Sequence, residues 1–274
     1  MESLRDKAKA FRALHAQPMV VLPNAWDAGS AAVLEHAGAP AVATTSGGVS
    51  WARGHGDGQG LSRAEMTEAI RQITAAVSVP VSADIEGGYG PDPGDVAATV
   101  TEVLGAGAVG VNLEDSRAGT LTLFSPSEQA ARLAAARSAA DEAGLPELWI
   151  NARTDVFLFG VGEPSGRLAD VLSRATAYAE AGVDSIFVPG LVDLEALGEL
   201  TAASPIPVAV MAWAGAPSVA EFAAAGVRRV TVGTALAQAA YGVALRATQE
   251  MLTGGTYDEL SSAMDFGALN GLFG

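Results

Sequence analysis

Cysteine is absent from the chain, and lysine and histidine are scarce. Lysine occurs only at positions 7 and 9, and histidine only at positions 15, 36 and 55. The lack of cysteine excludes disulfides, thiolate nucleophiles and cysteine-ligated zinc. The lack of lysine beyond position 9 excludes Schiff-base chemistry from the body of the chain. The polar chemistry that remains belongs to carboxylates, arginine, hydroxyl groups and the backbone.

Positive charge is in short supply as well. The 274 residues carry 16 Lys and Arg against 31 Asp and Glu, for a formal net charge of -15. Nucleic acids and anionic membranes bind basic surfaces, so we expect neither as a partner. There is no apolar run of about 18 residues and no apolar signal core near the N-terminus, so we expect a cytoplasmic protein.

Hydrophobic residues make up 49% of the chain, enough for a sizeable core. Short apolar runs typical of strands alternate with alanine-rich stretches typical of helices. The predicted strands cover residues 19–26, 41–48, 79–86, 110–116, 148–155, 185–190, 207–212 and 229–233. The predicted helices cover residues 28–37, 62–76, 93–106, 127–143, 167–181, 193–202, 218–225 and 234–252. Several of them end in Ala-Gly, which favours a left-handed cap.

Eight strands with helices between them predict a (β/α)8 TIM barrel rather than a doubly wound sheet. Barrels of this kind commonly form one domain of roughly 200–250 residues. We therefore expect a single domain over residues 1–274, with an N-terminal helical extension over 1–18 and a C-terminal helical segment over 234–274.

The most informative stretch is residues 79–90, where an apolar run ends in two carboxylates followed by glycines. Period-two geometry predicts that Asp84 and Glu86 lie on the same side of a strand. Two such acids repel each other and resist burial. A hard divalent cation with oxygen ligands is the natural compensation.

Polar residues gather at the ends of the first five predicted strands, where a barrel carries its chemistry. These ends are residues 24–27, 44–48, 84–86, 112–116 and 151–155. Structural roles are the alternatives. Asp115 and Asp155 can cap helices, Asn112 and Asn151 can satisfy interior backbone groups, Gly47 and Gly48 can form a tight turn, Asp57 can be a turn residue, and Arg153 can be a structural partner for the acids.

Taken together, the strand ends favour a ligand site. Asp84, Glu86 and Glu114 form an acidic mouth that a metal balances, and Arg153 clamps a carboxylate or an enolate oxygen. Ser46 and the N–H groups of the two glycines after it offer a second anion-binding rim. The ligand predicted by this set is a small 2-oxo carboxylate chelated to the metal, whose enolate the site stabilises.

These residues resemble the isocitrate lyase / phosphoenolpyruvate mutase superfamily. The resemblance extends from about Leu22 to Thr234. Its motifs are LPNAWD at 22–27, TSGG at 45–48, DIEGGYG at 84–90, GVNLED at 110–115, NARTD at 151–155 and IFVPG at 186–190. Six motifs in the right order, each at a predicted strand end, make the resemblance quite specific.

The resemblance implies a Mg²⁺-dependent enzyme on a (β/α)8 barrel, with Mn²⁺ as the alternative metal. It implies that Asp84 meets the metal directly and that three further acids, Glu86, Glu114 and Asp57, act through waters. The residues implied to hold the substrate are Ser46, Gly47, Gly48 and Arg153, with Trp26 as a wall of the site. Catalysis is assigned to Arg153, Asp57 and Glu114. The last barrel helix is commonly exchanged between subunits in this family, so we expect a homodimer or homotetramer.

The departures from the family narrow the reaction. Isocitrate and methylisocitrate lyases carry a Lys-x-Cys-Gly-His loop after the fourth strand, and residues 115–126 here contain no thiol. We therefore reject those two activities. The lysine and asparagine of the phosphonomutase loop are missing, and Val188-Pro189 stands near the sixth strand end where mutases often carry a histidine. Glu86 also stands where the family more often has Asp.

The leading hypothesis is a Mg²⁺-dependent lyase or decarboxylase that acts on a small 2-oxo or 2-hydroxy dicarboxylate through a metal-stabilised enolate. Two alternatives stay open. One is a phosphonopyruvate hydrolase or carboxyphosphonoenolpyruvate phosphonomutase, and the other is a catalytically silent 2-oxo acid binding protein. The candidate proton donors are water, Tyr89, Thr120 and Thr122.

Overall fold

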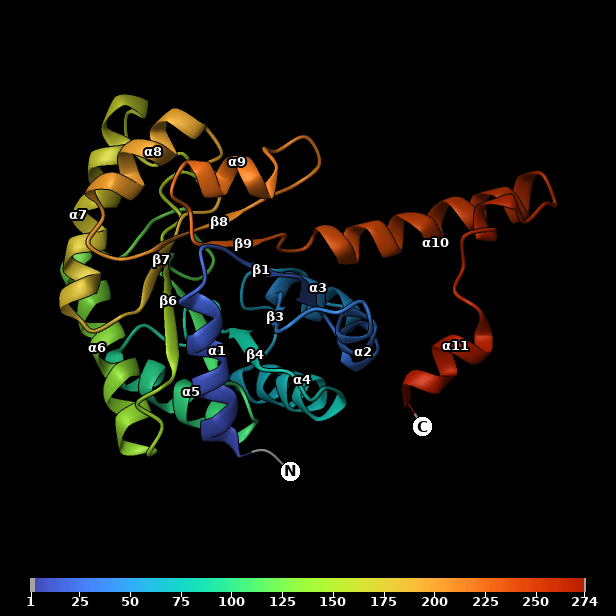
Figure 1. Ribbon diagram of the computed structural model, residues 1–274, viewed down its shortest axis with the longest axis horizontal. Helices are drawn as coiled ribbons and strands as arrows, with labels where there is room; N and C mark the ends of the chain where they lie inside the picture. The colour runs from blue at the N-terminus through green and yellow to red at the C-terminus, as the bar shows by residue number, and fades with distance from the viewer. Residues whose placement is uncertain (1–2, 274) are drawn as a thin grey trace.

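The computed structural model describes residues 3–273 as a nearly closed barrel of parallel strands with helices around it (Figure 1). The strands are β1 (Val20–Leu22), β2 (Asn24–Ala25), β3 (Val42–Thr44), β4 (Val81–Asp84), β5 (Gly110–Glu114), β6 (Trp149–Arg153), β7 (Ser185–Phe187), β8 (Val208–Met211) and β9 (Arg229–Thr231). Their order in the sheet is β1-β9-β8-β7-β6-β5-β4-β3-β2. The predicted TIM barrel is confirmed.

The first predicted strand is divided in two at Pro23. β1 pairs with β9, whereas β2 pairs with β3. Proline has no N–H to donate to a neighbouring strand, so the ladder is interrupted at this residue. The Pro23 carbonyl still accepts a hydrogen bond from the Ala43 N–H at 3.0 Å. The barrel is closed through this one short, interrupted strand.

Each strand from β2 to β9 is followed by a helix, as the alternating pattern predicts. The helices around the barrel are α2 (Ala28–His36), α4 (Arg63–Ala76), α5 (Pro93–Gly105), α6 (Pro126–Glu142), α7 (Arg167–Glu180), α8 (Leu194–Ala203) and α9 (Val219–Ala224), with the 3-10 turn η1 (Pro164–Gly166) before α7. Residues Gly38, Gly107, Gly144, Gly182 and Gly226 all adopt positive φ after their helices. The predicted Ala-Gly caps are therefore confirmed.

A short helix that the sequence did not predict follows β3. The predicted strand 41–48 ends at Thr44, and α3 (Ser46–Ala52) begins two residues later. A Cβ on Gly47 would lie 2.9 Å from an Asp57 carboxylate oxygen, and one on Gly48 would lie 2.8 Å from Trp26 Cβ. Glycine is required here by the close approach of neighbouring side chains, which a strand pattern does not show.

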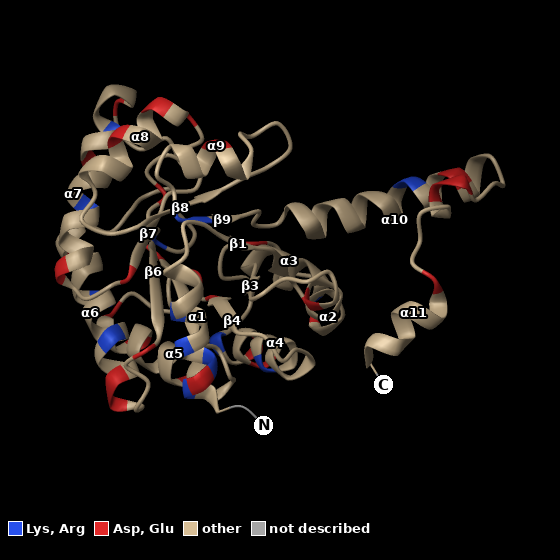
Figure 2. Ribbon diagram, viewed as in Figure 1, with Lys and Arg blue, Asp and Glu red and all other residues tan. Residues whose placement is uncertain are grey.

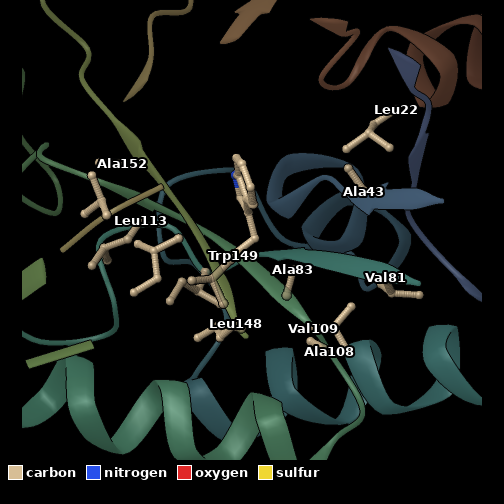
Figure 3. Packing of buried hydrophobic residues seen from close by; sticks show 14 of the residues in the cluster. Leu22, Ala43, Val81, Ala83, Ala108, Val109, Leu113, Leu148, Trp149 and Ala152 are labelled. Atoms are coloured by element: carbon tan, nitrogen blue, oxygen red, sulfur yellow. The ribbon is translucent and has the colours of Figure 1, made fainter. Parts of the chain in front are cut away.

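The core fills the space between the strands and the helices. Figure 3 shows part of it, where Ala83 and Val81 of β4 lie near Val109 and Ala108, which lead into β5. Most of these side chains are fully buried. Small residues on the strands let the surrounding helices approach closely.

Helix α1 (Leu4–His15) lies against the N-terminal end of β6. Its Phe11 is buried, and its His15 ring stacks on Trp149 with ring centroids 3.8 Å apart. Arg12 donates to the carbonyls of Glu147 and Leu148, which lead into the same strand. The helix within the predicted N-terminal extension therefore packs on the barrel end opposite the C-terminal ends of the strands.

The C-terminal segment behaves differently, because α10 (Ala235–Thr253) runs away from the barrel (Figure 1). Its first half carries no charged side chain (Figure 2). It is followed by η2 (Asp258–Leu260), α11 (Phe266–Asn270) and η3 (Gly271–Phe273), and η3 contacts α2. Among residues 3–273, no helix combines the length and the apolar character needed to cross a bilayer.

We expect His15 to make the protein less stable in acid. Burial, together with the charges of Arg229 and Arg12, lowers the pKa of His15 to about 4, although its contact with the Phe11 carbonyl opposes this. The unfolded chain keeps a histidine pKa of about 6.5. Between these values only the unfolded chain takes up the proton, so the free energy of unfolding falls as the pH is lowered, by on the order of 1–2 kcal/mol at pH 5.

Urea unfolding at pH 7 and pH 5 measures this effect. His15→Gln should lose less stability than the wild type between the two pH values, and His36→Gln, which changes an exposed histidine, should behave like the wild type. An equal loss in the wild type and His15→Gln would show that His15 does not cause the acid sensitivity.

Candidate active site

A cavity of about 220 Å³ opens at the C-terminal ends of the strands. Its lining includes both polar and apolar residues. The polar lining comes from Asn24, Thr45, Ser46, Gly47, Asp57, Asp84, Asn112, Arg153, Thr231 and Thr234, and the remaining lining from Leu158, Phe187, Pro189, Met211 and Gly233. The cavity lies where a TIM barrel carries its active site.

Five of the residues predicted for the site line this cavity, namely Ser46, Gly47, Asp57, Asp84 and Arg153. The other four, Trp26, Gly48, Glu86 and Glu114, do not. Glu114 is paired with Arg153, and Gly48 packs against Trp26. Trp26 lines a separate groove between α2 and the C-terminal segment, because the chain turns into α2 there and the Trp26 N–H donates to Ser30 Oγ.

Asp84 ends β4 and contacts Ser46 in the lining of the cavity. Its Oδ2 accepts hydrogen bonds from the Ser46 N–H at 3.0 Å and from Ser46 Oγ at 2.8 Å. Its own N–H donates to Thr44 Oγ1 at 2.8 Å. Asp84 is 8% exposed, and its Oδ1 accepts no hydrogen bond from any residue that the structure describes. This oxygen is therefore free to bind a ligand.

Glu86 does not continue the strand, which corrects the prediction that period-two geometry aligns it with Asp84. β4 ends at Asp84, and Glu86 adopts a left-handed φ of 49°. Its carboxylate accepts hydrogen bonds from the Gln59 N–H and from Tyr89 Oη. Gln59 and Tyr89 also have positive φ, at 60° and 57°. Strained backbone of this kind persists only where its surroundings hold it in place.

Both carboxylate oxygens of Glu86 are thus occupied by protein donors. Burial raises the pKa of Glu86, and the charges of Asp84 and Asp57 add to that shift against the opposing hydrogen bonds. Glu86 therefore holds the 57–60 loop next to the cavity, and any contact with a metal would run through water.

Arg153 is held between two acids at the end of β6. Its Nη1 lies 2.8 Å from Glu114 Oε2, and its Nε donates to Asp155 Oδ1 at 2.7 Å. Burial disfavours the charged form of Arg153, but the charges of Glu114, Asp155 and Asp84 outweigh it and raise the pKa. Nη2 is left without a hydrogen-bond acceptor among the described residues, so this edge of the guanidinium can receive an anion.

Glu114 is buried and engaged on both oxygens. Ser116 Oγ donates to its Oε1, and Arg153 pairs with its Oε2. Burial raises the pKa of Glu114, while the charge of Arg153 opposes the shift. Glu114 holds Arg153 in place and does not line the cavity. The sequence had predicted a catalytic role for Glu114.

A second buried network supports the first. Asp115 Oδ1 accepts from the Asp155 N–H at 3.0 Å, and its Oδ2 accepts from Arg174 Nη1 at 2.9 Å and Tyr178 Oη at 2.8 Å. The same Arg174 nitrogen donates to the Phe124 carbonyl, which ends the loop after β5. The caps of α6 and α7 are Ser125 and Gly166, so neither Asp115 nor Asp155 caps the following helix.

The structure also bears on the predicted metal. No group of three Asp, Glu or His side chains within residues 3–273 is placed to hold a metal ion by itself. Two acids, Asp84 and Asp57, nevertheless line the cavity, and burial together with the Asp84 charge raises the pKa of Asp57. Excess negative charge and hard oxygen donors fit Mg²⁺, which usually keeps several waters and binds through one or two carboxylates.

Sequence reasoning missed Arg229, the first residue of β9. Its side chain is 1% exposed, and its Nη2 donates to Asn112 Oδ1 at 3.2 Å. Asn112 in turn accepts from Asn151 Nδ2 at 2.8 Å, so the two asparagines bond to side chains and not to the interior backbone groups that the sequence suggested as an alternative. Asn112 also lines the cavity. The sequence did contain a signal for Arg229. Arg229 and Thr231 are two residues apart on one strand, so both side chains point to the inner face of the barrel.

Comparison with known proteins shows which families and structures this chain resembles. The sequence model for phosphoenolpyruvate phosphomutase matches residues 11–252. A Mycobacterium tuberculosis protein without an assigned activity is 36% identical over 226 residues, 82% of each chain. An oxaloacetate decarboxylase of Rhodopseudomonas palustris is 31% identical over 214 residues, covering 75% of this chain and 71% of the relative. A Burkholderia cenocepacia structure, described provisionally as a lyase or mutase, is 38% identical with a TM-score of 0.91 and covers 98% of this chain and 97% of that one.

We expect the buried pair of Arg174 and Asp115 to be important for stability. Arg174→Met leaves the fully buried Asp115 carboxylate without its cation, which should lower the free energy of unfolding by about 3–5 kcal/mol in urea titrations. The exposed pair of Arg246 and Glu259 is the matched control, and Arg246→Met should cost less than about 1 kcal/mol. Equal losses in the two variants would contradict the proposed support of the site.

Proposed function

This chain belongs to the phosphoenolpyruvate phosphomutase family, and from that premise we propose that it is a Mg²⁺-dependent carbon–carbon lyase or decarboxylase. The substrate that we propose is a small 2-oxo or 2-hydroxy dicarboxylate of the oxaloacetate type. Relatives with assigned activities include lyases, decarboxylases and a phosphorylmutase. Family membership alone leaves the reaction open, so the choice rests on the site.

The observation that carries the proposal is the position of Arg153 in one small cavity with two acids, Asp84 and Asp57. The volume of about 220 Å³ lies below the range of roughly 300–1,000 Å³ typical of drug-sized ligands. A guanidinium that is already held by two carboxylates loses little conformational freedom when it binds a third. The site therefore suits a compact anion that also binds a cation.

The side chains of the cavity have separable roles in this proposal. Arg153 binds the substrate carboxylate through its remaining N–H groups, and Ser46 fixes the orientation of Asp84 by two hydrogen bonds. Asp84 would hold Mg²⁺, and the metal would supply positive charge that stabilises a developing enolate. The enclosing walls exclude water and strengthen these electrostatic interactions.

Decarboxylation suits a cavity with this lining. The bond between the β-carbon and its carboxylate breaks, CO₂ leaves, and the electron pair becomes the enolate of the remaining 2-oxo acid. No base is needed for this step, and the cavity described here is lined by no lysine, cysteine or histidine. The enolate then takes a proton at carbon to give the product.

The positions of the candidate proton donors favour water over the three side chains. Tyr89 does not line the cavity, and its hydroxyl donates to Glu86. Thr120 and Thr122 are hydrogen-bonded to each other in an exposed turn after β5. Water is thus the donor that we propose for this conformation of the loop.

Phosphonate chemistry is supported less well. A phosphonate carries more negative charge than a carboxylate, and Arg153 is the one cationic side chain that lines the cavity within residues 3–273. The lining also includes Leu158, Phe187 and Met211, which offer no hydrogen bond to an additional oxyanion. A binding protein without turnover remains the other outcome of the assay below.

We expect turnover of an oxaloacetate-type acid that depends on a divalent metal. The purified protein is incubated with Mg²⁺ and a panel of 2-oxo acids, 2-alkylmalates and phosphonopyruvate, and pyruvate, glyoxylate and phosphate are measured. Release of pyruvate or glyoxylate that stops on addition of EDTA supports the proposal. Phosphate release identifies phosphonate chemistry instead, and binding by calorimetry without any product identifies a binding protein.

The control for this assay is Arg153→Lys, which keeps the positive charge but replaces the planar guanidinium with an ammonium group. It should weaken the binding of oxalate by roughly 10- to 100-fold, because a lysine has a single nitrogen and cannot contact Glu114, Asp155 and the ligand in the geometry of a guanidinium. Arg71→Ala, on the exposed face of α4, should leave binding unchanged. Oxalate binding that is unaffected in Arg153→Lys would remove Arg153 from the site.

We also propose that the protein forms a homodimer or homotetramer through α10. Leu245 is 60% exposed and Leu252 is 80% exposed on a helix that extends away from its own barrel (Figure 1). Exposed apolar surfaces of this kind mark interaction sites. Two copies of this chain repel each other through their net charge of -15. The first half of α10 carries no charged side chain, so a second copy can approach there without that repulsion at the contact.

Light scattering after size-exclusion chromatography measures the assembly. We expect a mass of two or four chains, and Leu245→Glu should shift it toward one chain because it introduces a charge into the apolar face. Leu121→Glu is the matched control, since Leu121 is also largely exposed, at 71%, but lies in the loop after β5. A wild-type mass of a single chain would contradict the assembly.

A further inference from the structure

Arg229 lies one layer beneath the cavity. It is the first residue of β9, where it pairs with Val20 of β1 and Ala209 of β8. Thr231, two residues along the same strand, lines the cavity. Alternate residues of a strand share a face, so Arg229 and Thr231 both point into the barrel. The guanidinium is thus enclosed by the barrel at a level below the ligand site.

One residue links this guanidinium to the cavity. Arg229 Nη2 donates to Asn112 Oδ1 at 3.2 Å, and Asn112 lines the cavity floor. Asn112 is also the β5 residue in register with Asp84 of β4. The positive charge therefore lies close to the acid that is expected to bind the metal.

No acid within residues 3–273 is in direct contact with the Arg229 guanidinium. Within the described residues it forms no ion pair, and its Nε and Nη1 find no hydrogen-bond acceptor. Burial lowers the pKa of Arg229 to about 10, and the charge of Asp84 partly opposes this, so the group stays protonated at neutral pH. A buried charge without a partner acts over a longer distance than an exposed one.

A purely structural role does not explain a charge at this position. Asn112 Oδ1 already accepts a hydrogen bond from Asn151, whose own carbonyl accepts from Ser185 Oγ at 2.6 Å. These amides are satisfied without Arg229. Burial of an unpaired guanidinium is costly, and an apolar side chain of similar length would fill the same space without that cost.

We propose that Arg229 is the second cation of the site, a fixed positive charge beneath the cavity floor that strengthens anion binding and opposes cation binding. Arg153 touches the ligand, whereas Arg229 acts through Asn112 and through its field, so it is a positioning residue. The inference rests on the proposed function, because it assumes that the cavity holds a divalent cation and an oxo acid.

Removal of the Arg229 charge should change the affinities for Mg²⁺ and for oxalate in opposite directions. A loss of structure would instead weaken the binding of both ligands. Arg229→Met should bind Mg²⁺ on the order of 100-fold more tightly and, at saturating Mg²⁺, bind oxalate on the order of 100-fold more weakly. This is the size expected for one unit charge acting on a divalent ion over roughly 10 Å at an effective dielectric constant of about 20. Isothermal titration calorimetry measures both affinities on the full chain.

Arg228 provides a matched control, because it is the neighbouring arginine but is exposed outside the barrel. Arg228→Met removes the same charge and should change neither affinity. Arg229→Lys keeps the charge and should stay close to the wild type, and it also serves where Arg229→Met fails to fold. Circular dichroism and a cooperative melting transition establish folding for each variant.

The outcomes distinguish this inference from the proposed function. Wild-type protein that binds neither Mg²⁺ nor oxalate overturns both. If the wild type binds both ligands, unchanged affinities in Arg229→Met overturn the inference alone, as does a parallel loss of both affinities in the folded variant. Arg229→Lys that behaves like Arg229→Met also overturns it, because charge is then not the cause.

Discussion

The site depends on the fixed position of Arg153 between two carboxylates. β5 and β6 pair so that Glu114 stands opposite Arg153, which brings acid and base together through the register of the sheet. Asp155 holds the other edge of the guanidinium, and its own backbone N–H is bound by Asp115. A buried arginine is costly unless it is paired and hydrogen-bonded, so its geometry is determined over several elements. The remaining N–H groups are then presented to the cavity without a further ordering cost.

The balance of charge in and below the cavity follows from this arrangement. Asp84 and Asp57 line the cavity, while Glu86 and Glu114 beside them are engaged by protein donors. Two guanidiniums offset them, one in the wall and Arg229 beneath the floor. In a chain of net charge -15, we propose that these local cations determine which anions can bind in the cavity. The absence of cysteine from the whole sequence leaves this electrostatic environment as the main chemical resource of the site.

Much of the fold and part of the site could be predicted from the sequence, for reasons that particular residues show. Regular alternation of apolar strands and Ala-Gly-capped helices predicts the barrel, and Asp84 and Arg153 stand at strand ends where the fold exposes them. Glu86 was misplaced because its left-handed backbone depends on contacts with Gln59 and Tyr89 that lie outside the local pattern. Trp26 was misplaced for a similar reason, since the turn into α2 sets its direction.

Thr234 has a place in both the ligand site and the assembly element. It lines the cavity, and it is also the residue from which α10 begins. Its methyl group packs so closely that a Cβ on Gly47 would lie 2.9 Å from it. Under the proposed function, a ligand that contacts Thr234 would couple occupancy of the cavity to the anchoring of α10, and each would change the free energy of the other by the same amount. The concentration of a small metabolite that fills the cavity would then depend on the dilution at which the proposed subunits separate.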